Sequence, residues 1–553
     1  MSVWDFKRNK VLLTLKGHLR DIQNINISKN GDKIISSSLD NTFKVWNAEK
    51  GNLLFSINAH NYYVRSAYFS PYENQILSSS DDNTTKCWSA KNGNLLYTIL
   101  CPDSAGYFVV TPKGFYKCSK EFSKNIHYVS KELKIITFDQ LDIKYNRPDK
   151  VLEAIGSTDT ALIRSYRQAY LKRIKKLGID TSSFKEGFTI PEADFTNREQ
   201  LAFEQSVRTM RVHINGNSSV NLDRFNIWVN EVPVYGQKGI SLRRRLINKL
   251  DTTISITLSA GENQIETSVT DVNGIESYRQ PLFVKYNPEK PVKSNTYFIG
   301  IGINRFADSK NNLSWSVKDI RDLSQYFATK GAIIDTLFDE RVTRDNILSL
   351  KRRLAGTTEE DKVIIAYSGH GLLSSDFDYY LSTHTVNFSK PEENGLPYEE
   401  LESLLDGIRA RKKLMLIDAC HSGEVDKEEI TRYETATDSL QIKGTRGGKP
   451  RLTSGSSLGM KNSFELMQEL FVNVGRSTGA TVISAAGGTQ FAQERGDLKN
   501  GVFSFVLLEL LRKNKTVSIS DLKNTVLKLV PELTNGLQKP TFRSETQRFD
   551  WSL

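Results

Sequence analysis

The chain has 553 residues, of which 38% are hydrophobic and 25% charged, and its formal net charge is +11. A chain of this length exceeds a single hydrophobic core, so we expect several domains of a globular protein. No apolar run reaches the roughly 18 residues of a membrane-spanning helix, and the first residues lack the apolar core of a signal peptide. We therefore expect a cytoplasmic protein without a membrane segment.

The cysteines and the basic residues argue against metal sites and nucleic-acid binding. The four cysteines form no CxxC pair, which argues against a disulfide framework or a zinc site and suits a reducing cytosol. Lysine and arginine are scattered among 64 acidic residues and form no known nucleic-acid motif. We predict no metal, no required cofactor and no nucleic-acid partner.

Residues 1–100 contain markers that recur at an interval of about 42 residues. The recurring pairs are His18 and His60, Asp40 and Asp82, and Trp46 and Trp88. This period and these residues resemble WD repeats, in which four strands form one propeller blade. We expect about two blades here, with both histidines as structural residues that hydrogen-bond within a blade. Two blades cannot close a ring, because propellers usually have roughly four to eight. Either the chain is a shortened version of a longer one, or a protein partner or a second copy supplies the missing blades.

Two further regions precede the C-terminal half. Residues 101–195 are predicted to be a connector that contains an amphipathic helix, because apolar residues recur at three- and four-residue spacing from 162 to 177 and Gly178 follows. Residues 196–290 alternate apolar and polar side chains between turn signals such as Asn273-Gly274. We predict an all-β, immunoglobulin-like sandwich there, with a spacing or interaction role.

Residues 291–553 alternate predicted strands and helices, which indicates an α/β sheet with helices on both faces. Two of its apolar runs stop abruptly at polar motifs: Tyr-Ser-Gly-His-Gly at 367–371 and Asp-Ala-Cys-His-Ser-Gly at 418–423. Such runs are typical of buried parallel strands, and open α/β sheets carry their sites at the carboxyl ends of strands. We therefore expect His370 and Cys420 to share one site.

The two motifs, in this order and at this spacing, resemble those of the caspases, and more closely those of metacaspases and bacterial orthocaspases. Residues 298–304 and 538–542 are similar to that family's first strand and tail, and residues 138–149 to the connector of bacterial proteins that join WD repeats to a caspase-like domain. The resemblance implies a protease in which Cys420 attacks the peptide bond and His370 acts as its base and proton donor. It also implies an oxyanion hole formed by the backbone N–H groups of Gly371 and Cys420.

The residue two positions before the cysteine bears on specificity. True caspases have Gln-Ala-Cys-Arg-Gly at this place and cleave after aspartate, whereas this chain has Asp418, as metacaspases do. Residues i and i+2 of a strand share a face, so the Asp418 carboxylate is expected beside Cys420. An acidic pocket there would select substrates with Arg or Lys at the cleaved bond. Glu494 is a second candidate for the same pocket.

A long polar segment, 424–475, follows the cysteine. Caspase relatives are often cut at this place, which suggests self-cleavage after Lys443, Arg446 or Lys449; an ordinary disordered insertion is the alternative. We predict a cysteine endopeptidase that cleaves proteins after Arg or Lys and is regulated through its N-terminal modules. An inactive caspase-fold scaffold that binds partners through the WD repeats and the sandwich is the alternative. Some metacaspases need calcium, but the chain has no EF-hand-like loop, so calcium activation stays open.

Overall fold

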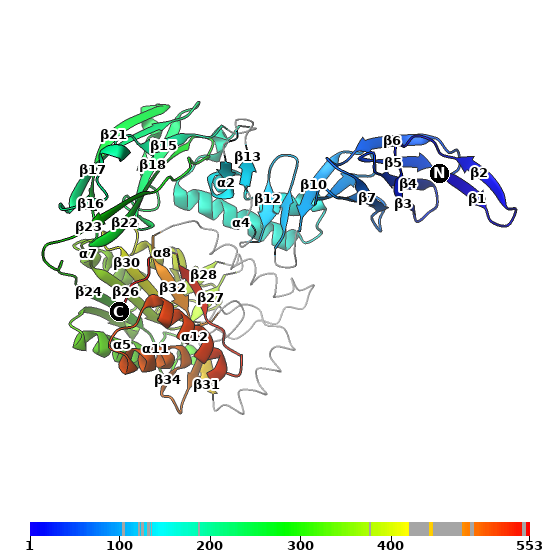
Figure 1. Ribbon diagram of the computed structural model, residues 1–553. Coiled ribbons are helices and arrows are strands. Elements are labelled where there is room, and N and C mark those ends of the chain that lie inside the picture. Colours follow the sequence, from blue (N-terminus) through cyan, green and yellow to red (C-terminus); the bar gives the residue numbers. More distant parts are fainter. Residues whose placement is uncertain are drawn as a thin grey trace. The chain divides into compact units, whose positions relative to one another are not determined.

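The computed structural model describes most of the chain. The residues outside the description are 102–105, 120–121, 123–126, 130–132, 134, 186–188, 375–377, 420–441, 446–477, 487–491 and 545–548. The chain divides into two compact units, Met1–Leu171 and Lys172–Leu553, and each is described by itself (Figure 1). Among the described residues, no helix combines the length and the apolar character needed to cross a lipid bilayer.

The first unit is built from antiparallel strands. Its described sheets are a β1–β2 hairpin, a sheet in the order β3-β4-β5-β6, a sheet in the order β12-β11-β10-β9-β8-β7, and a β13–β14 pair in the connector. The strands are β1 (Ser2–Asp5), β2 (Lys10–Thr14), β3 (Ile22–Ile27), β4 (Lys33–Ser38), β5 (Thr42–Asn47), β6 (Leu53–Asn58), β7 (Val64–Phe69), β8 (Gln75–Ser80), β9 (Thr85–Ser89), β10 (Leu95–Leu100), β11 (Phe108–Val110) and β12 (Tyr116–Cys118). The sheet that contains β7 to β12 thus continues past residue 100, which is the boundary predicted for the blade region.

The two repeated histidines are structural, as predicted. The His18 imidazole lies 2.9 Å from Asp40 Oδ2 through Nδ1 and 2.8 Å from Ser36 Oγ through Nε2, and the Trp46 indole donates to the same hydroxyl at 2.9 Å. His60 makes the equivalent contacts with Asp82 and Ser78, which also accepts a hydrogen bond from Trp88. Each histidine therefore links the start of its repeat to two strands of the same blade.

The connector is helical and covers part of the second blade. It contains β13 (His127–Val129), β14 (Ile135–Thr137), α2 (Phe138–Tyr145), α3 (Pro148–Ile155) and α4 (Thr160–Leu177). Val151 of α3 is fully buried against Cys87, Tyr97 and Val109 of the blade. Helix α4 covers the residues for which an amphipathic helix is predicted, and Gly178 follows it with a positive φ of 63°, a conformation that favours glycine.

The second unit begins with two β-sheets that share one core. The described strands pair in the orders β15-β17-β21 and β16-β23-β22-β18-β19, and β20 also pairs with β18. They are β15 (Glu192–Phe195), β16 (Glu204–Gln205), β17 (Thr209–Asn217), β18 (Leu222–Val229), β19 (Val232–Pro233), β20 (Ile240–Ser241), β21 (Lys249–Thr257), β22 (Gly261–Asp271) and β23 (Leu282–Tyr286). Val212, Ile227 and Val269, from three different strands, meet in that core. We call residues 192–286 the two-sheet domain; its immunoglobulin-like character stays a prediction.

The C-terminal α/β domain has a mostly parallel sheet in the order β25-β24-β26-β30-β32-β35 among the described strands. The strands are β24 (Thr296–Gly302), β25 (Ile333–Phe338), β26 (Lys362–Ser368), β30 (Lys412–Asp418), β32 (Thr481–Ser484) and β35 (Thr541–Ser544), and β35 alone of these runs antiparallel to its neighbour. Smaller sheets pair β27 (Gly371–Leu373), β28 (Tyr379–Leu381) and β29 (Leu396–Pro397), and β31 (Ile442–Thr445), β33 (Gln493–Arg495) and β34 (Asn500–Gly501).

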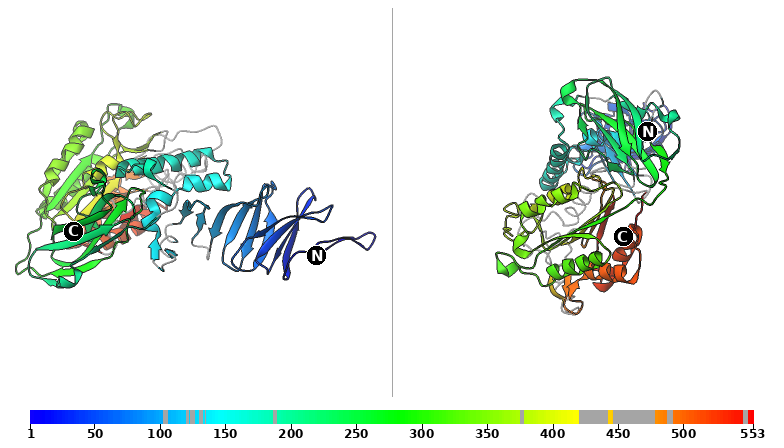
Figure 2. Two further views of the ribbon diagram at one scale, coloured as in Figure 1. Left: turned by 90° about the horizontal axis from the view of Figure 1, so that it is seen from above. Right: turned by 90° about the vertical axis from the view of Figure 1, so that its left-hand side faces the viewer.

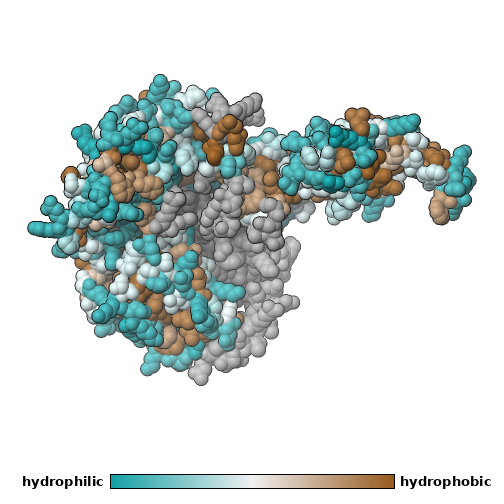
Figure 3. All heavy atoms as spheres, in the orientation of Figure 1, coloured by the Kyte–Doolittle hydropathy of each residue, from teal (hydrophilic) through white to brown (hydrophobic). Residues whose placement is uncertain are grey.

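Both faces of this sheet are covered, because side chains alternate along a strand. Ile365 of β26 belongs to one core, which includes residues of α6 (Arg344–Ser349), α7 (Lys351–Leu354) and α8 (Tyr398–Ser403). Its neighbour Ile364 belongs to the core on the opposite face, which includes residues of α5 (Ser316–Thr329), α11 (Val502–Lys513) and α12 (Ile519–Leu533). Figure 1 and Figure 2 show helices of this domain beside the sheet, and the face of this unit drawn in Figure 3 mixes hydrophilic residues with smaller hydrophobic patches. The predicted α/β sheet is thus confirmed.

Candidate active site

The two strands that lead into the predicted motifs are neighbours. β26 and β30 are parallel, and their register pairs Lys362 with Lys412 at one end and Ser368 with Asp418 at the other. One more hydrogen bond, 3.2 Å from Gly369 N–H to the Asp418 carbonyl, extends the contact beyond the ladder. His370 and Cys420 each come two positions after these last paired residues. Cys420 itself lies outside the described residues.

The turn between β26 and His370 requires a glycine. A Cβ added at Gly369 would lie 2.5 Å from Tyr367 Oη and 2.6 Å from Ile303 Cγ2, both closer than real Cβ contacts. The Tyr367 hydroxyl is held in turn by the Ser382 carbonyl at 2.9 Å. The chain can therefore turn sharply at the strand end only because position 369 has no side chain.

The imidazole of His370 is buried and held in one orientation. Its Nε2 lies 2.8 Å from the backbone carbonyl of Asn311, and the ring packs against Phe306 and Phe388 with centroid distances of 5.2 Å. A carbonyl only accepts hydrogen bonds, so we assign the proton of the neutral ring to Nε2. Nδ1 then carries the lone pair, which makes it the nitrogen that can act as a base.

Gly371 follows His370 as the first residue of β27 and is paired in register with Leu381 of β28. Ser382 directly follows β28 and makes two hydrogen bonds to the backbone of His370. Its N–H donates to the His370 carbonyl at 2.9 Å, and its hydroxyl accepts from the His370 N–H at 3.0 Å. This brace fixes the backbone around the predicted base. The oxyanion role of Gly371 stays a prediction.

Asp418 is buried at the carboxyl end of β30. Its Oδ2 accepts hydrogen bonds from the Ser504 hydroxyl at 2.6 Å and from the Ser504 N–H at 3.3 Å. Ser504 belongs to the first turn of α11, where the helix dipole favours a negative charge. The carboxylate thus lies at the same sheet edge as His370, and its role toward a substrate stays a prediction.

A second buried carboxylate lies beside the same strand end. Asp319, on the first turn of α5, accepts hydrogen bonds from Asn500 Nδ2 at 2.7 Å and from the Gly501 N–H at 3.1 Å, and the Ser368 hydroxyl approaches it at 3.5 Å. Because Ser368 is paired with Asp418, both carboxylates adjoin one residue of β26. Sequence reasoning missed Asp319, whose only signal is an acidic residue in the first turn of a predicted helix.

Glu494 has a positioning role in the described structure. Its two carboxylate oxygens accept from the backbone N–H groups of Ser314 and Trp315 at 3.0 and 2.9 Å, directly before α5. These bonds hold the start of the helix that carries Asp319. The predicted contact of Glu494 with a substrate stays a prediction.

Comparison with known families decides the class of this domain. Residues 299–551 match the family model of the caspase domain, and residues 9–47 and 51–89 match that of the WD domain, G-beta repeat. The C-terminal domain is a caspase domain. Two WD repeats thus precede a caspase domain in this chain, and no curated protein matches it.

Two of the solved structures that match are similar to about a fifth of the chain. One is the crystal structure of the computationally designed Ika8 protein, with 25% sequence identity and a TM-score of 0.17 over 21% of this chain and 38% of that chain. Another is the crystal structure of the Mitotic Checkpoint Complex, with 20% identity and a TM-score of 0.16 over 20% of this chain and 40% of that chain. The chain therefore spans about two fifths of the length of each of these two structures.

The segment after the predicted nucleophile is not a loop throughout. Within it, β31 pairs with β33, and Gly444 lies in register with Glu494. Lys443 is part of β31, although nothing of its side chain is described, while Arg446 and Lys449 lie outside the described residues. Within the ranges that the structure describes, no cluster of three or more His, Cys, Asp or Glu side chains is arranged to hold a metal ion.

Proposed function

We propose that this protein is a cysteine endopeptidase that cleaves protein substrates after Arg or Lys. One observation carries the proposal. His370, oriented by the Asn311 carbonyl, stands at the end of a strand whose parallel neighbour leads within two residues to Cys420. The match to the caspase domain supports the same chemistry.

In the proposed reaction, Nδ1 of His370 takes the proton of the Cys420 thiol, whose ordinary pKa of about 8.5 leaves it mostly protonated at neutral pH. The thiolate attacks the substrate carbonyl carbon, and the backbone N–H groups of Gly371 and Cys420 stabilise the oxyanion. The imidazole then gives its proton to the leaving amine, which breaks the peptide bond and leaves a thioester. A water molecule, deprotonated by His370, hydrolyses this thioester. Throughout, Nε2–H stays on the Asn311 carbonyl, which keeps the ring in place.

The proposed specificity for basic residues rests on two buried carboxylates near the same strand end. Asp418 and Asp319 both adjoin Ser368; Ser504 in the first turn of α11 donates to Asp418, and Gly501, directly before that helix, donates to Asp319. A guanidinium or ammonium group is attracted to such a pair through charge-assisted hydrogen bonds. An aspartate at the cleaved bond would be repelled.

Peptides that end in Arg, Lys or Asp before a fluorogenic leaving group test the proposal. We expect the purified chain to hydrolyse the first two and not the third. Cys420→Ala should abolish the activity, and His370→Ala should lower kcat by about 10²- to 10⁴-fold. Hydrolysis of none of the three peptides, with and without calcium, would favour the inactive scaffold instead.

We further propose that the protein cuts itself within 424–475. Mass spectrometry of the wild-type chain should find termini after Lys443, Arg446 or Lys449, and the Cys420→Ala chain should stay whole. A wild-type chain that is fully active on peptides yet intact would show that self-cleavage is not required. The WD repeats are proposed to dock a protein partner, which is the common use of such repeats.

A further inference from the structure

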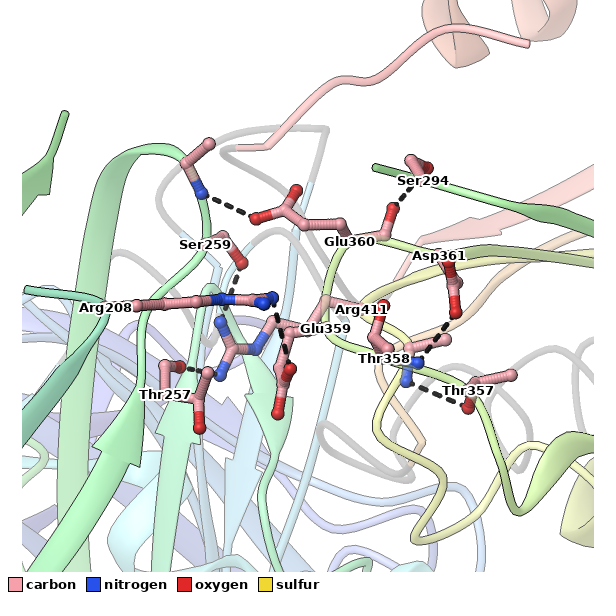
Figure 4. Close-up of polar contacts among 12 residues, drawn as sticks. Arg208, Thr257, Ser259, Ser294, Thr357, Thr358, Glu359, Glu360, Asp361 and Arg411 are labelled. Carbon is pink, nitrogen blue, oxygen red and sulfur yellow. Dashed lines mark hydrogen bonds and ion pairs between the residues drawn. The ribbon is translucent and has the colours of Figure 1, made fainter. Parts of the chain in front are cut away.

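Charged residues join the two-sheet domain to the caspase domain within residues 172–553. Arg411 stands directly before β30 and reaches across to the end of β21. Its Nη1 donates to Ser259 Oγ at 2.7 Å, and its Nη2 donates to the Thr257 carbonyl at 2.5 Å (Figure 4). Both arms of one guanidinium therefore hold the same short stretch of the two-sheet domain.

Two glutamates of the caspase domain make contacts in the same place. Glu360 accepts from the Ala260 N–H at 2.6 Å through Oε1 and from Lys412 Nζ at 3.3 Å through Oε2. Glu359 pairs with Arg208 of the two-sheet domain at 3.4 Å (Figure 4). We call these residues the Arg411 cluster: Arg208, Thr257, Ser259, Ala260, Glu359, Glu360, Arg411 and Lys412.

The linker between the domains is bonded into the same turn. The Ser294 hydroxyl donates to the Glu360 carbonyl at 2.8 Å, and the Asn295 N–H donates to Asp361 Oδ1 at 2.7 Å. The two domains also meet at a second place, where the N–H of Gln237 in the two-sheet domain donates to Oδ1 of Asp406 in the caspase domain at 2.8 Å. Contacts at two places restrict rotation of one domain against the other.

The guanidinium of Arg411 is desolvated but stays charged. Burial lowers the pKa of Arg411 to about 10, although Glu359 and Glu360 act in the opposite direction. Its flat, rigid fork matches two acceptors at fixed positions, which the single point charge of a lysine cannot do. Arg411 therefore fixes the orientation of the two-sheet domain relative to the start of β30, in addition to attracting it.

Both strands that lead to the site begin in this cluster. Glu360 and Asp361 precede β26, which ends two residues before His370, and Arg411 precedes β30, which ends two residues before Cys420. Seven residues of strand span roughly 20 Å. We propose that the two-sheet domain is a fixed brace of the peptidase, in which Arg411 is a positioning residue that sets the alignment of β26 and β30. The catalytic part of this inference rests on the proposed function.

The test uses Arg411→Met, which keeps the length of the side chain but removes its charge and its forked end, and compares it with Arg411→Lys. The control is Arg409→Met, because Arg409 is an exposed arginine two residues away. We expect Arg411→Met to raise hydrogen exchange at residues 257–260 and at the carboxyl ends of β26 and β30. For an Arg-ending peptide, we expect kcat to fall about tenfold or more, because His370 and Cys420 follow the ends of these two strands, and KM to rise as well, because Asp418 ends β30. Arg411→Lys should restore part of both signals, and Arg409→Met should change neither.

Two results would overturn the inference. Unchanged exchange at the strand ends in Arg411→Met would show that Arg411 holds no strand, and raised exchange with unchanged kcat would show that the contact only attaches the domains. Should Arg411→Met not fold, Ser259→Ala removes one acceptor of Arg411 and Glu360→Ala removes the acceptor of the Ala260 N–H, and the same two readouts apply. If the wild-type chain hydrolyses no peptide, the proposed function fails, whereas the exchange measurements still decide whether the brace exists.

Discussion

Two buried carboxylates, Asp319 and Asp418, adjoin Ser368 at the end of β26, and each is expected to contribute to the recognition of a basic substrate residue. Asp418→Asn keeps an acceptor for the Ser504 hydroxyl but removes the charge. We expect kcat/KM for Arg-ending peptides to fall about 10- to 100-fold, as the loss of one charge-assisted hydrogen bond implies, and Asp319→Asn to act in the same direction.

The control is Asp335→Asn, a partly exposed carboxylate on the edge strand β25 that pairs with Arg353. It should leave kcat/KM unchanged. An Asp418→Asn chain that keeps its full preference for Arg over uncharged residues would contradict the acidic pocket.

The polar residues at the strand ends could be predicted from sequence because each motif follows an apolar run. The partner of His370 could not, since it is the backbone carbonyl of Asn311, and a carbonyl is present at every position. Asp319 was missed for a related reason: an acidic residue near a helix start is common, and only tertiary contacts bring it to Ser368.

At the scale of single elements, the turn after β26 depends on the glycine at 369. Gly369→Ala would place a Cβ 2.5 Å from Tyr367 Oη, so either the hydroxyl or the turn must move. We expect a loss of stability of about 1–3 kcal/mol from overpacking and a fall in kcat, because His370 is the next residue. Thermal unfolding and peptide hydrolysis measure the two effects. Gly356→Ala is the matched control, since a Cβ there has no neighbour within 4 Å; equal effects of the two substitutions would contradict a steric cause.

The first WD blade is expected to depend on the charge of Asp40. Burial by itself raises the pKa of Asp40, but hydrogen bonds from the Thr42 hydroxyl, the Leu19 N–H and His18 lower it to about 2. A carboxyl whose pKa is lower in the folded state stabilises fully above its ordinary pKa of 3.8, and this stabilisation is lost as the pH falls toward 2.

We therefore expect Asp40→Asn to lower the unfolding temperature of the first unit by about 5 °C at pH 6 and to reduce its further decrease between pH 6 and pH 3. Tryptophan fluorescence during heating is the measurement, because Trp46 lies in this blade. Asp21→Asn, at an exposed position of the same repeat, is the control. Identical acid sensitivity of Asp40→Asn and the wild-type chain would show that another group controls the transition.

At the scale of the whole molecule, the order of the regions follows from the sequence, because each has its own periodicity: a repeat of about 42 residues, alternating strands, and strands that alternate with helices. The position at which the blade region ends could not be predicted from the sequence. Strands β11 and β12 have three residues each, which is too short to show the alternation of apolar and polar residues that predicts a strand. They nevertheless extend the sheet of the second blade. Likewise, the contact of Arg411 with Ser259 joins residues far apart in sequence and leaves no local signal.

The division into two compact units leads to a prediction about the peptidase. All the described site residues, the Arg411 cluster and both cores of the caspase sheet lie within 172–553. A chain that begins after Gly156, where α3 ends, keeps α4 and the whole second unit. We expect it to hydrolyse short Arg-ending peptides with kcat/KM within about twofold of the full chain, because a short peptide needs only the pocket and the catalytic pair.

The comparison needs both proteins at equal concentration of active sites, measured by titration with a thiol-reactive peptide. A tenfold loss of kcat/KM on deletion of residues 1–156 would mean that the WD repeats take part in forming the site; preserved activity would assign them to the recruitment of protein substrates or partners.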